Sequence, residues 1–282
     1  MRMGESARNM AGTVVLIHGP WVTALSWEHW VRRYTEQGLH VIARSWPGME
    51  GDIDALRHDP SAIAALGISD VVDHYERIVR SLGRAPIIIG HSLGGLVAQI
   101  LLDRGLGAAA VAIDSAPVKG TFAWPFSRPN VGGGASRQPA GHHGALALTL
   151  EQFHAAFTSN LSETASVPIF KRYAVPGPDP MLFQTSLANF NPYAVTTVNF
   201  HNDRRAPLLL VAGGKDRVVP AAVTKANFNL YKMSLAITDY KEFPDRSHYT
   251  VGEDAWEEVA DYALTWAAGR TATRVPMQLT VH

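Results

Sequence analysis

The sequence predicts an α/β fold: a three-layer α/β/α sandwich around a mostly parallel sheet of about six strands. Short runs of apolar, β-branched residues alternate with amphipathic stretches, which is typical of a parallel sheet covered by helices on both faces. The chain has 282 residues, enough for one large domain with a sizeable core. Between residues 117 and 205 the alternation stops, which predicts an insertion in an otherwise regular fold.

The predicted strands are short. The strand at 14–17 is wholly apolar, and the strand at 86–90 is apolar up to Gly90, as strands buried on both faces should be. The six predicted strands cover residues 14–17, 40–46, 86–90, 108–114, 208–212 and 238–243.

Helices are predicted where apolar residues recur at helical spacing. Ser26 is a plausible N-cap for the first helix, and Gly38 ends it. Helical spacing covers residues 27–37, 71–82, 93–104 and 256–267.

The interrupted stretch is interpreted as a lid. We therefore expect a core domain formed by residues 1–116 and 206–282, with residues 117–205 inserted over the carboxyl edge of the sheet. A Gly- and Pro-rich segment at 127–144 precedes three helical candidates at 150–160, 165–174 and 181–190. A separate domain is the alternative, but the segment is short and poorly patterned for one.

Composition limits the partners. Lys plus Arg equals Asp plus Glu, at 25 each, so no charge excess favours nucleic acid. The apolar run at 13–17 is too short for a signal-peptide core or a membrane span, so we expect a cytoplasmic protein without membrane insertion. The chain contains no cysteine, which excludes disulfides and thiolate nucleophiles. The expected partner is a small-molecule substrate, and a homodimer stays open.

A nucleophile is predicted at Ser92, in Gly90-His91-Ser92-Leu93-Gly94. The motif directly follows an apolar strand and directly opens a helix, the setting in which a tight turn exposes a serine hydroxyl above the sheet. The alternative is a glycine-rich turn whose serine only caps the helix.

A serine hydroxyl needs a base, and the base needs an orienting acid. Asp216 follows the strand at 208–212, and His248 lies between the last strand and the last helix. We predict Ser92, Asp216 and His248 as a triad at the carboxyl edge, where open α/β sheets bind ligands. Asp114, at the end of the fourth strand, is the alternative acid.

The chain has 12 histidines, so position must select among them. The pair His142 and His143 has no acidic residue nearby at ligand spacing, so we interpret it as solvated rather than metal-binding. We predict no metal site and no cofactor.

Four motifs together resemble the α/β-hydrolase superfamily over residues 13–268: 16–19 (Leu-Ile-His-Gly), 90–95, 213–216 and His248. The resemblance implies two antiparallel strands before the first motif, but only about a dozen residues precede it, so we expect these strands to be missing. It also implies that the backbone N–H after His18-Gly19 forms half of an oxyanion hole. Pro20 occupies that position and has no N–H. Leu93 N–H supplies the other half, and Trp21 is the expected replacement through its backbone N–H, or alternatively through its indole.

These features predict a serine hydrolase that cleaves a carboxylic ester or lactone of a small to medium, largely apolar substrate. Two alternatives stay open: a lyase-like or C–C bond-cleaving enzyme, which the Pro20 anomaly motivates, and a receptor-like binding protein that retains the triad. The residues expected to bind substrate are Trp21, His91, Phe122, Trp124, Phe157 and Phe183.

Overall fold

A six-stranded, all-parallel sheet forms the centre of the molecule in the computed structural model, which describes residues 12–121 and 144–271. Its strand order is β2-β1-β3-β4-β7-β8. The strands are β1 (Thr13–Ile17), β2 (His40–Ala43), β3 (Ile87–His91), β4 (Ala109–Ile113), β7 (Leu208–Gly213) and β8 (Thr238–Phe243). The predicted fold class and strand number are confirmed. From β1 the chain adds β2 on one side and then β3 on the other, so the direction in which strands are added reverses between β1 and β3. Ligands of open α/β sheets bind at such a switch point.

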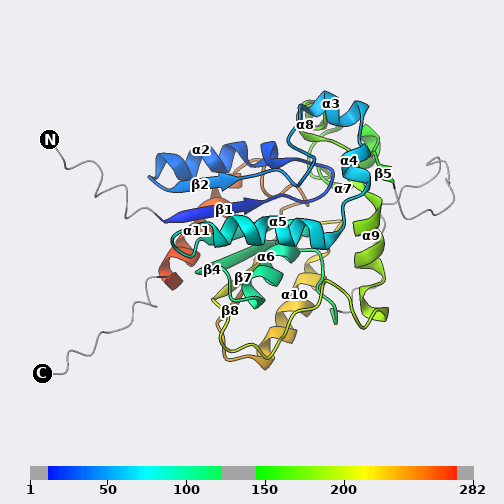
Figure 1. The fold of residues 1–282 in the computed structure, drawn as a ribbon. Helices are drawn as coiled ribbons and strands as arrows, with labels where there is room; N and C mark the ends of the chain where they lie inside the picture. Colours follow the sequence, from blue (N-terminus) through cyan, green and yellow to red (C-terminus); the bar gives the residue numbers. More distant parts are fainter. Residues whose placement is uncertain (1–11, 122–143, 272–282) are drawn as a thin grey trace, which may run out of the picture.

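Helices cover both faces of the sheet (Figure 1). Val14 and Leu16 pack in the same apolar cluster as residues of α2 (Glu28–Glu36) and α11 (Trp256–Thr271). Val15 and Ile17 belong to the opposite cluster, with residues of α5 (Ile68–Arg80) and α6 (Leu93–Asp103). Because successive strand residues point to opposite faces, an all-apolar strand requires a helix layer on each side.

Within residues 117–205, the insertion lies beyond the carboxyl ends of the strands over 144–186 (Figure 1) and returns at 199–205 to the amino edge, where the Asn202 amide donates to Asp103 at the end of α6. Its elements are β5 (Ala145–Leu146), α7 (Leu150–Ala156), α8 (Glu163–Tyr173), β6 (Gly177–Pro178), α9 (Asp179–Ser186) and the short 3₁₀ helix η2 (Ala188–Phe190). Thr149 and Gln152 form a capping box at α7, and the Ser162 side chain caps α8. Phe153 and Phe157 share a buried cluster with Trp21 and Tyr249 from loops of the sheet. The insertion is therefore packed into the same body as the sheet loops.

Several local predictions differ from the structure. Ser26 does not cap the first helix; Thr23 caps a 3₁₀ helix, η1 (Ala24–Trp27), and the Ser26 hydroxyl donates to the Thr23 carbonyl. The second strand ends at Ala43 instead of residue 46. Two short helices, α3 (Ile53–His58) and α4 (Ser61–Ala64), and a longer one, α10 (Ala221–Leu230), were not predicted.

Helix α10 escaped prediction because its buried face is partly polar. Thr224 and Asn227 are both buried there, and the Asn227 amide donates to Gln99 in α6 at 2.8 Å. Apolar periodicity cannot detect such a face. Across the described ranges, no helix combines the length and the apolar character needed to cross a membrane.

Candidate active site

Ser92 stands at the sharp turn between β3 and α6, with φ +56° and ψ −122°. This conformation is strained for a residue with a side chain. A Cβ at Gly90 would lie 2.0 Å from the Gly94 carbonyl oxygen, and one at Gly94 would lie 2.1 Å from the Ile17 carbonyl oxygen. The turn can close only because neither position carries a side chain. The strand–turn–helix setting expected for Ser92 is confirmed.

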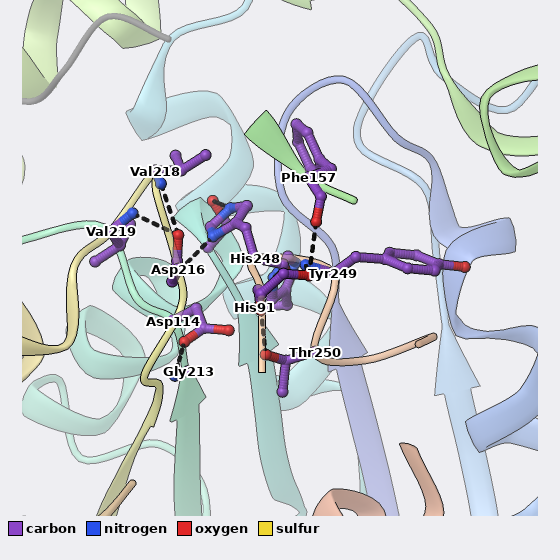
Figure 2. A network of polar contacts seen from close by, with 12 residues as sticks. His91, Asp114, Phe157, Gly213, Asp216, Val218, Val219, His248, Tyr249 and Thr250 are labelled. Carbon is purple, nitrogen blue, oxygen red and sulfur yellow. Dashed lines mark hydrogen bonds and ion pairs between the residues drawn. The ribbon is translucent and has the colours of Figure 1, made fainter. Parts of the chain in front are cut away.

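His248 links the serine to an acid. Its Nε2 lies 3.1 Å from Oγ of Ser92, and its Nδ1 lies 2.7 Å from Oδ2 of Asp216. The other carboxylate oxygen, Oδ1, accepts the backbone N–H groups of Val218 and Val219 at 2.7 and 2.8 Å (Figure 2). These two amides fix the carboxylate so that Oδ2 faces the imidazole. The structure thus brings together the three predicted residues from loops after β3, β7 and β8.

The alternative acid, Asp114, lies beside this pair but does not bond the imidazole. It is fully buried, and its Oδ1 accepts the Gly213 N–H at 2.6 Å (Figure 2). Burial, and then the negative charge of Asp216, raise the pKa of the Asp114 carboxyl well above its usual range. Asp114 is therefore suited to remain protonated while Asp216 serves the histidine.

His91 was expected to bind substrate, and the structure places it behind His248. Its Nε2 lies 2.8 Å from the His248 carbonyl oxygen, and the two rings are 4.8 Å apart. Burial, followed by the nearby His248, lowers the pKa of His91 well below its usual range. This buried ring, kept neutral by its surroundings, supports the loop that carries His248.

One group of side chains could in principle hold a metal. Among the described residues, His91, Asp114 and His248 offer ligand atoms within 4.8 Å of one another. Both nitrogens of His248 already serve Ser92 and Asp216. A metal ion there would have to break those contacts, so the arrangement favours proton transfer. The pair His142 and His143 lies outside the described residues.

The loop after β1 passes directly beside Ser92. A Cβ at Gly19 would lie 2.8 Å from Cβ of Ser92. Within this loop His18 stacks on Trp46 with ring centroids 4.7 Å apart, and its Nδ1 lies 2.8 Å from the Gly19 carbonyl oxygen. Burial lowers the pKa of His18 to about 4, so its ring is neutral and acts as a fixed support for the loop.

The two expected oxyanion donors occupy different settings. Leu93 is the first residue of α6, so its amide has no acceptor within the helix and lies at the positive end of the helix dipole. Trp21 has a left-handed backbone, with φ +65°. Its indole N–H donates to the Leu146 carbonyl at 3.0 Å, which removes the indole from the candidate donors. The backbone N–H of Trp21 is the remaining candidate.

The aromatic residues expected at the substrate site divide into three groups. The ring of Phe157 lies edge-on against His248, 5.1 Å between centroids, and 6.2 Å from the ring of Trp21. Phe183, on α9, has 46% of its surface exposed. Phe122 and Trp124 lie outside the described residues. Of these aromatic residues the structure therefore places Phe157 against His248, and Trp21 packs in turn against Phe157.

Support for the histidine loop was not predicted. The Tyr249 N–H donates to the Phe157 carbonyl at 2.9 Å, and the Ser247 hydroxyl lies 2.9 Å from the same oxygen. The Ser247 N–H donates to the buried carboxylate of Glu253 at 2.9 Å. The polar residues around His248 were visible in the sequence, but nothing in it linked them to an insertion residue some ninety positions earlier.

A three-layer α/β fold with a serine on a strand–turn–helix at the switch point defines the class of α/β hydrolases. The chain belongs to the alpha/beta hydrolase family, whose model matches residues 14–262. A search of curated protein sequences finds no match.

Solved structures share this fold at low sequence identity. A Paleococcus ferrophilus monoacylglycerol lipase is 19% identical with a TM-score of 0.64, covering 92% of this chain and 95% of its own. A pyrethroid hydrolase from Sphingobium faniae JZ-2 is 17% identical with a TM-score of 0.62, covering 93% and 100%. Tomato methylketone synthase I, complexed with 2-tridecanone, is 14% identical with a TM-score of 0.68, covering 93% and 99%. Such identities establish a common fold and leave the substrate open.

Proposed function

We propose that this protein is a serine hydrolase that cleaves a carboxylic ester or lactone of a small to medium, largely apolar substrate. The observation that carries the proposal is the continuous path from Ser92 Oγ through the His248 ring to Asp216, with separations of 3.1 and 2.7 Å. Membership of the alpha/beta hydrolase family supports hydrolysis as the reaction.

The mechanism begins with proton transfer from Ser92 Oγ to His248 Nε2 as the oxygen attacks the substrate carbonyl carbon. Asp216 accepts the Nδ1 hydrogen bond, which fixes the tautomer and stabilises the imidazolium. The N–H groups of Leu93 and Trp21 receive the oxyanion. Collapse of the tetrahedral intermediate breaks the ester C–O bond, and the leaving alkoxide takes the proton from His248.

Water completes the cycle. His248 takes a proton from the water as its oxygen attacks the acyl carbon, and the second tetrahedral intermediate forms in the same oxyanion site. Its collapse releases the carboxylic acid, and His248 returns the proton to Ser92. Every proton that leaves the serine is thus restored by the end of one turnover.

The apolar character of the substrate follows from the surroundings of the histidine. Phe157 lies against the His248 ring, and Trp21 packs edge-on to Phe157. Ser92 is only 6% exposed, so we expect an acyl group bound there to be largely shielded from water. Pockets lined mostly by apolar side chains with a few polar anchors favour compact apolar ligands.

The test is turnover of p-nitrophenyl esters of increasing acyl length, with a γ-lactone and a δ-lactone measured in parallel by pH-stat. Wild-type protein is expected to hydrolyse short to medium esters, and Ser92→Ala is expected to lose at least about 10⁴-fold in kcat. Equal activity of wild type and Ser92→Ala on every substrate would overturn the proposal. The ratio of ester to lactone turnover decides between the two substrate classes.

A further inference from the structure

Trp21 is held in an unfavourable backbone conformation. A bulky residue at φ +65° costs free energy, and such strain persists only where surrounding contacts impose it. Two hydrogen bonds join Trp21 to the insertion. Val175 donates its N–H to the Trp21 carbonyl at 2.9 Å, and the Trp21 indole donates to the Leu146 carbonyl at 3.0 Å.

The indole ring also lies against a residue with no side chain. Leu146 pairs with Gly177 in the antiparallel β5–β6 ladder. A Cβ at Gly177 would lie 2.9 Å from Nε1 of Trp21 and 3.1 Å from its Cδ1. Gly177 does not have the left-handed backbone that favours glycine. Its missing side chain therefore serves the fit of the Trp21 ring and not a turn.

The insertion contacts the second catalytic loop as well. The carbonyl of Phe157, just after α7, accepts the N–H of Tyr249, the residue next to the catalytic histidine, and the Phe157 ring packs on His248 (Figure 2). One insertion thus contacts both the loop that carries Trp21 and the loop that carries His248.

We infer that the β5–β6 ladder, together with Val175 just before it, positions the oxyanion hole: Leu146, Val175 and Gly177 fix Trp21 so that its backbone N–H replaces the donor that Pro20 lacks. The inference rests on the proposed function and deepens it, because it makes acylation depend on the seating of the insertion. Leu146, Val175 and Gly177 are positioning residues that act through Trp21. Since a displacement of about 1 Å in a reacting geometry can cost roughly 10²-fold in rate, a small shift of Trp21 is expected to be visible in kcat.

Gly177→Ala tests the inference, with Gly144→Ala as its matched control. Gly144 directly precedes the same ladder, but a Cβ there meets no atom of the described residues within 4 Å. Gly177→Ala is expected to lower kcat for a p-nitrophenyl ester roughly 10- to 100-fold with a smaller change in KM. Gly144→Ala is expected to match wild type. The indole N–H resonance of Trp21 in a ¹H–¹⁵N spectrum should shift only in Gly177→Ala.

Trp21→Phe provides a second variant. It removes the indole N–H that bonds Leu146, so it is expected to lower kcat about 10-fold by itself. The smaller ring leaves room for a Cβ at residue 177. Adding Gly177→Ala to Trp21→Phe should therefore cost clearly less than adding it to wild type.

The outcomes separate the two proposals. If wild-type protein turns over esters while Gly177→Ala equals Gly144→Ala in kcat, the positioning role is overturned and the role of Ser92 stands. Equal costs of Gly177→Ala in the wild-type and Trp21→Phe backgrounds would overturn it too. A wild-type protein without esterase or lactonase activity would overturn the proposed function, and the positioning role with it.

Discussion

Asp216 Oδ2 lies 2.7 Å from Nδ1 of His248, and neither side chain is exposed. The two backbone amides that donate to Oδ1 fix the carboxylate, so Oδ2 is held in one orientation toward the imidazole. Ordering of this kind sets the tautomer in which Nε2 is free to accept the serine proton.

Asp216→Asn is expected to reduce kcat by about 10³- to 10⁴-fold, because an amide would stabilise the wrong imidazole tautomer. Steady-state hydrolysis of a p-nitrophenyl ester measures the loss. Asp245→Asn is the matched control: this side chain is 85% exposed and forms an ion pair with Lys215, so kcat should be unchanged. A kcat of Asp216→Asn within tenfold of wild type would contradict the assignment.

Asp114→Asn is expected to stabilise the protein increasingly as pH rises. The pKa of this carboxyl is raised above its ordinary value of 3.8 by burial and by Asp216. Above that value the unfolded chain is ionised while the folded protein keeps the proton, so wild-type stability falls by up to about 1.4 kcal/mol per pH unit. An amide does not titrate, so the variant avoids this loss. Urea unfolding measured from pH 4 upward should show a difference that widens until the pH passes the folded-state pKa of Asp114 and then levels off, and a difference that stays constant from pH 4 would contradict the raised pKa.

Ser92→Gly is expected to be more stable than Ser92→Ala by about 1 kcal/mol, although both are inactive. Alanine keeps the strain of φ +56°, which costs on the order of 1–3 kcal/mol, whereas glycine adopts this conformation freely. The greater entropy of glycine in the unfolded chain offsets part of the gain. Denaturant midpoints of the two variants give the comparison. Equal stability would mean that the turn at Ser92 is not strained.

Gly90→Ala is expected to prevent the native turn, because its Cβ would lie 2.0 Å from the Gly94 carbonyl oxygen. We expect a loss of more than about 3 kcal/mol, or no soluble folded protein. Gly83→Ala is the control, since a Cβ there meets nothing within 4 Å in the part of the chain that the structure describes. Thermal unfolding of Gly83→Ala should match wild type; a Gly90→Ala protein as stable as that control would argue against the tight turn.

The sequence predicted the sheet and the proximity of Ser92, Asp216 and His248 because both depend on local signals. Apolar runs mark β1 and β3, and the glycines around Ser92 mark a turn that few other residues permit. Asp216 and His248 follow strands, so their meeting at the carboxyl edge follows from the topology.

What the sequence could not predict are contacts between distant segments. Nothing local indicates that Gly177 makes room for Trp21, or that the Phe157 carbonyl accepts the N–H of Tyr249. His91, in the middle of the motif, was expected at the substrate. Its buried position behind His248 depends on the path of a loop 157 residues later. Such pairings are decided by packing in three dimensions, and no periodicity encodes them.

Peptide mapping after reaction with a fluorophosphonate tests the central claim most directly, because the reagent phosphonylates an activated serine. We expect one adduct per chain, on the peptide that contains Ser92, in the wild-type protein, and a labelling rate at least about 10³-fold lower in His248→Ala. An adduct on another serine, or equal labelling of Ser92 in wild type and His248→Ala, would contradict the claim that His248 activates Ser92 as the nucleophile.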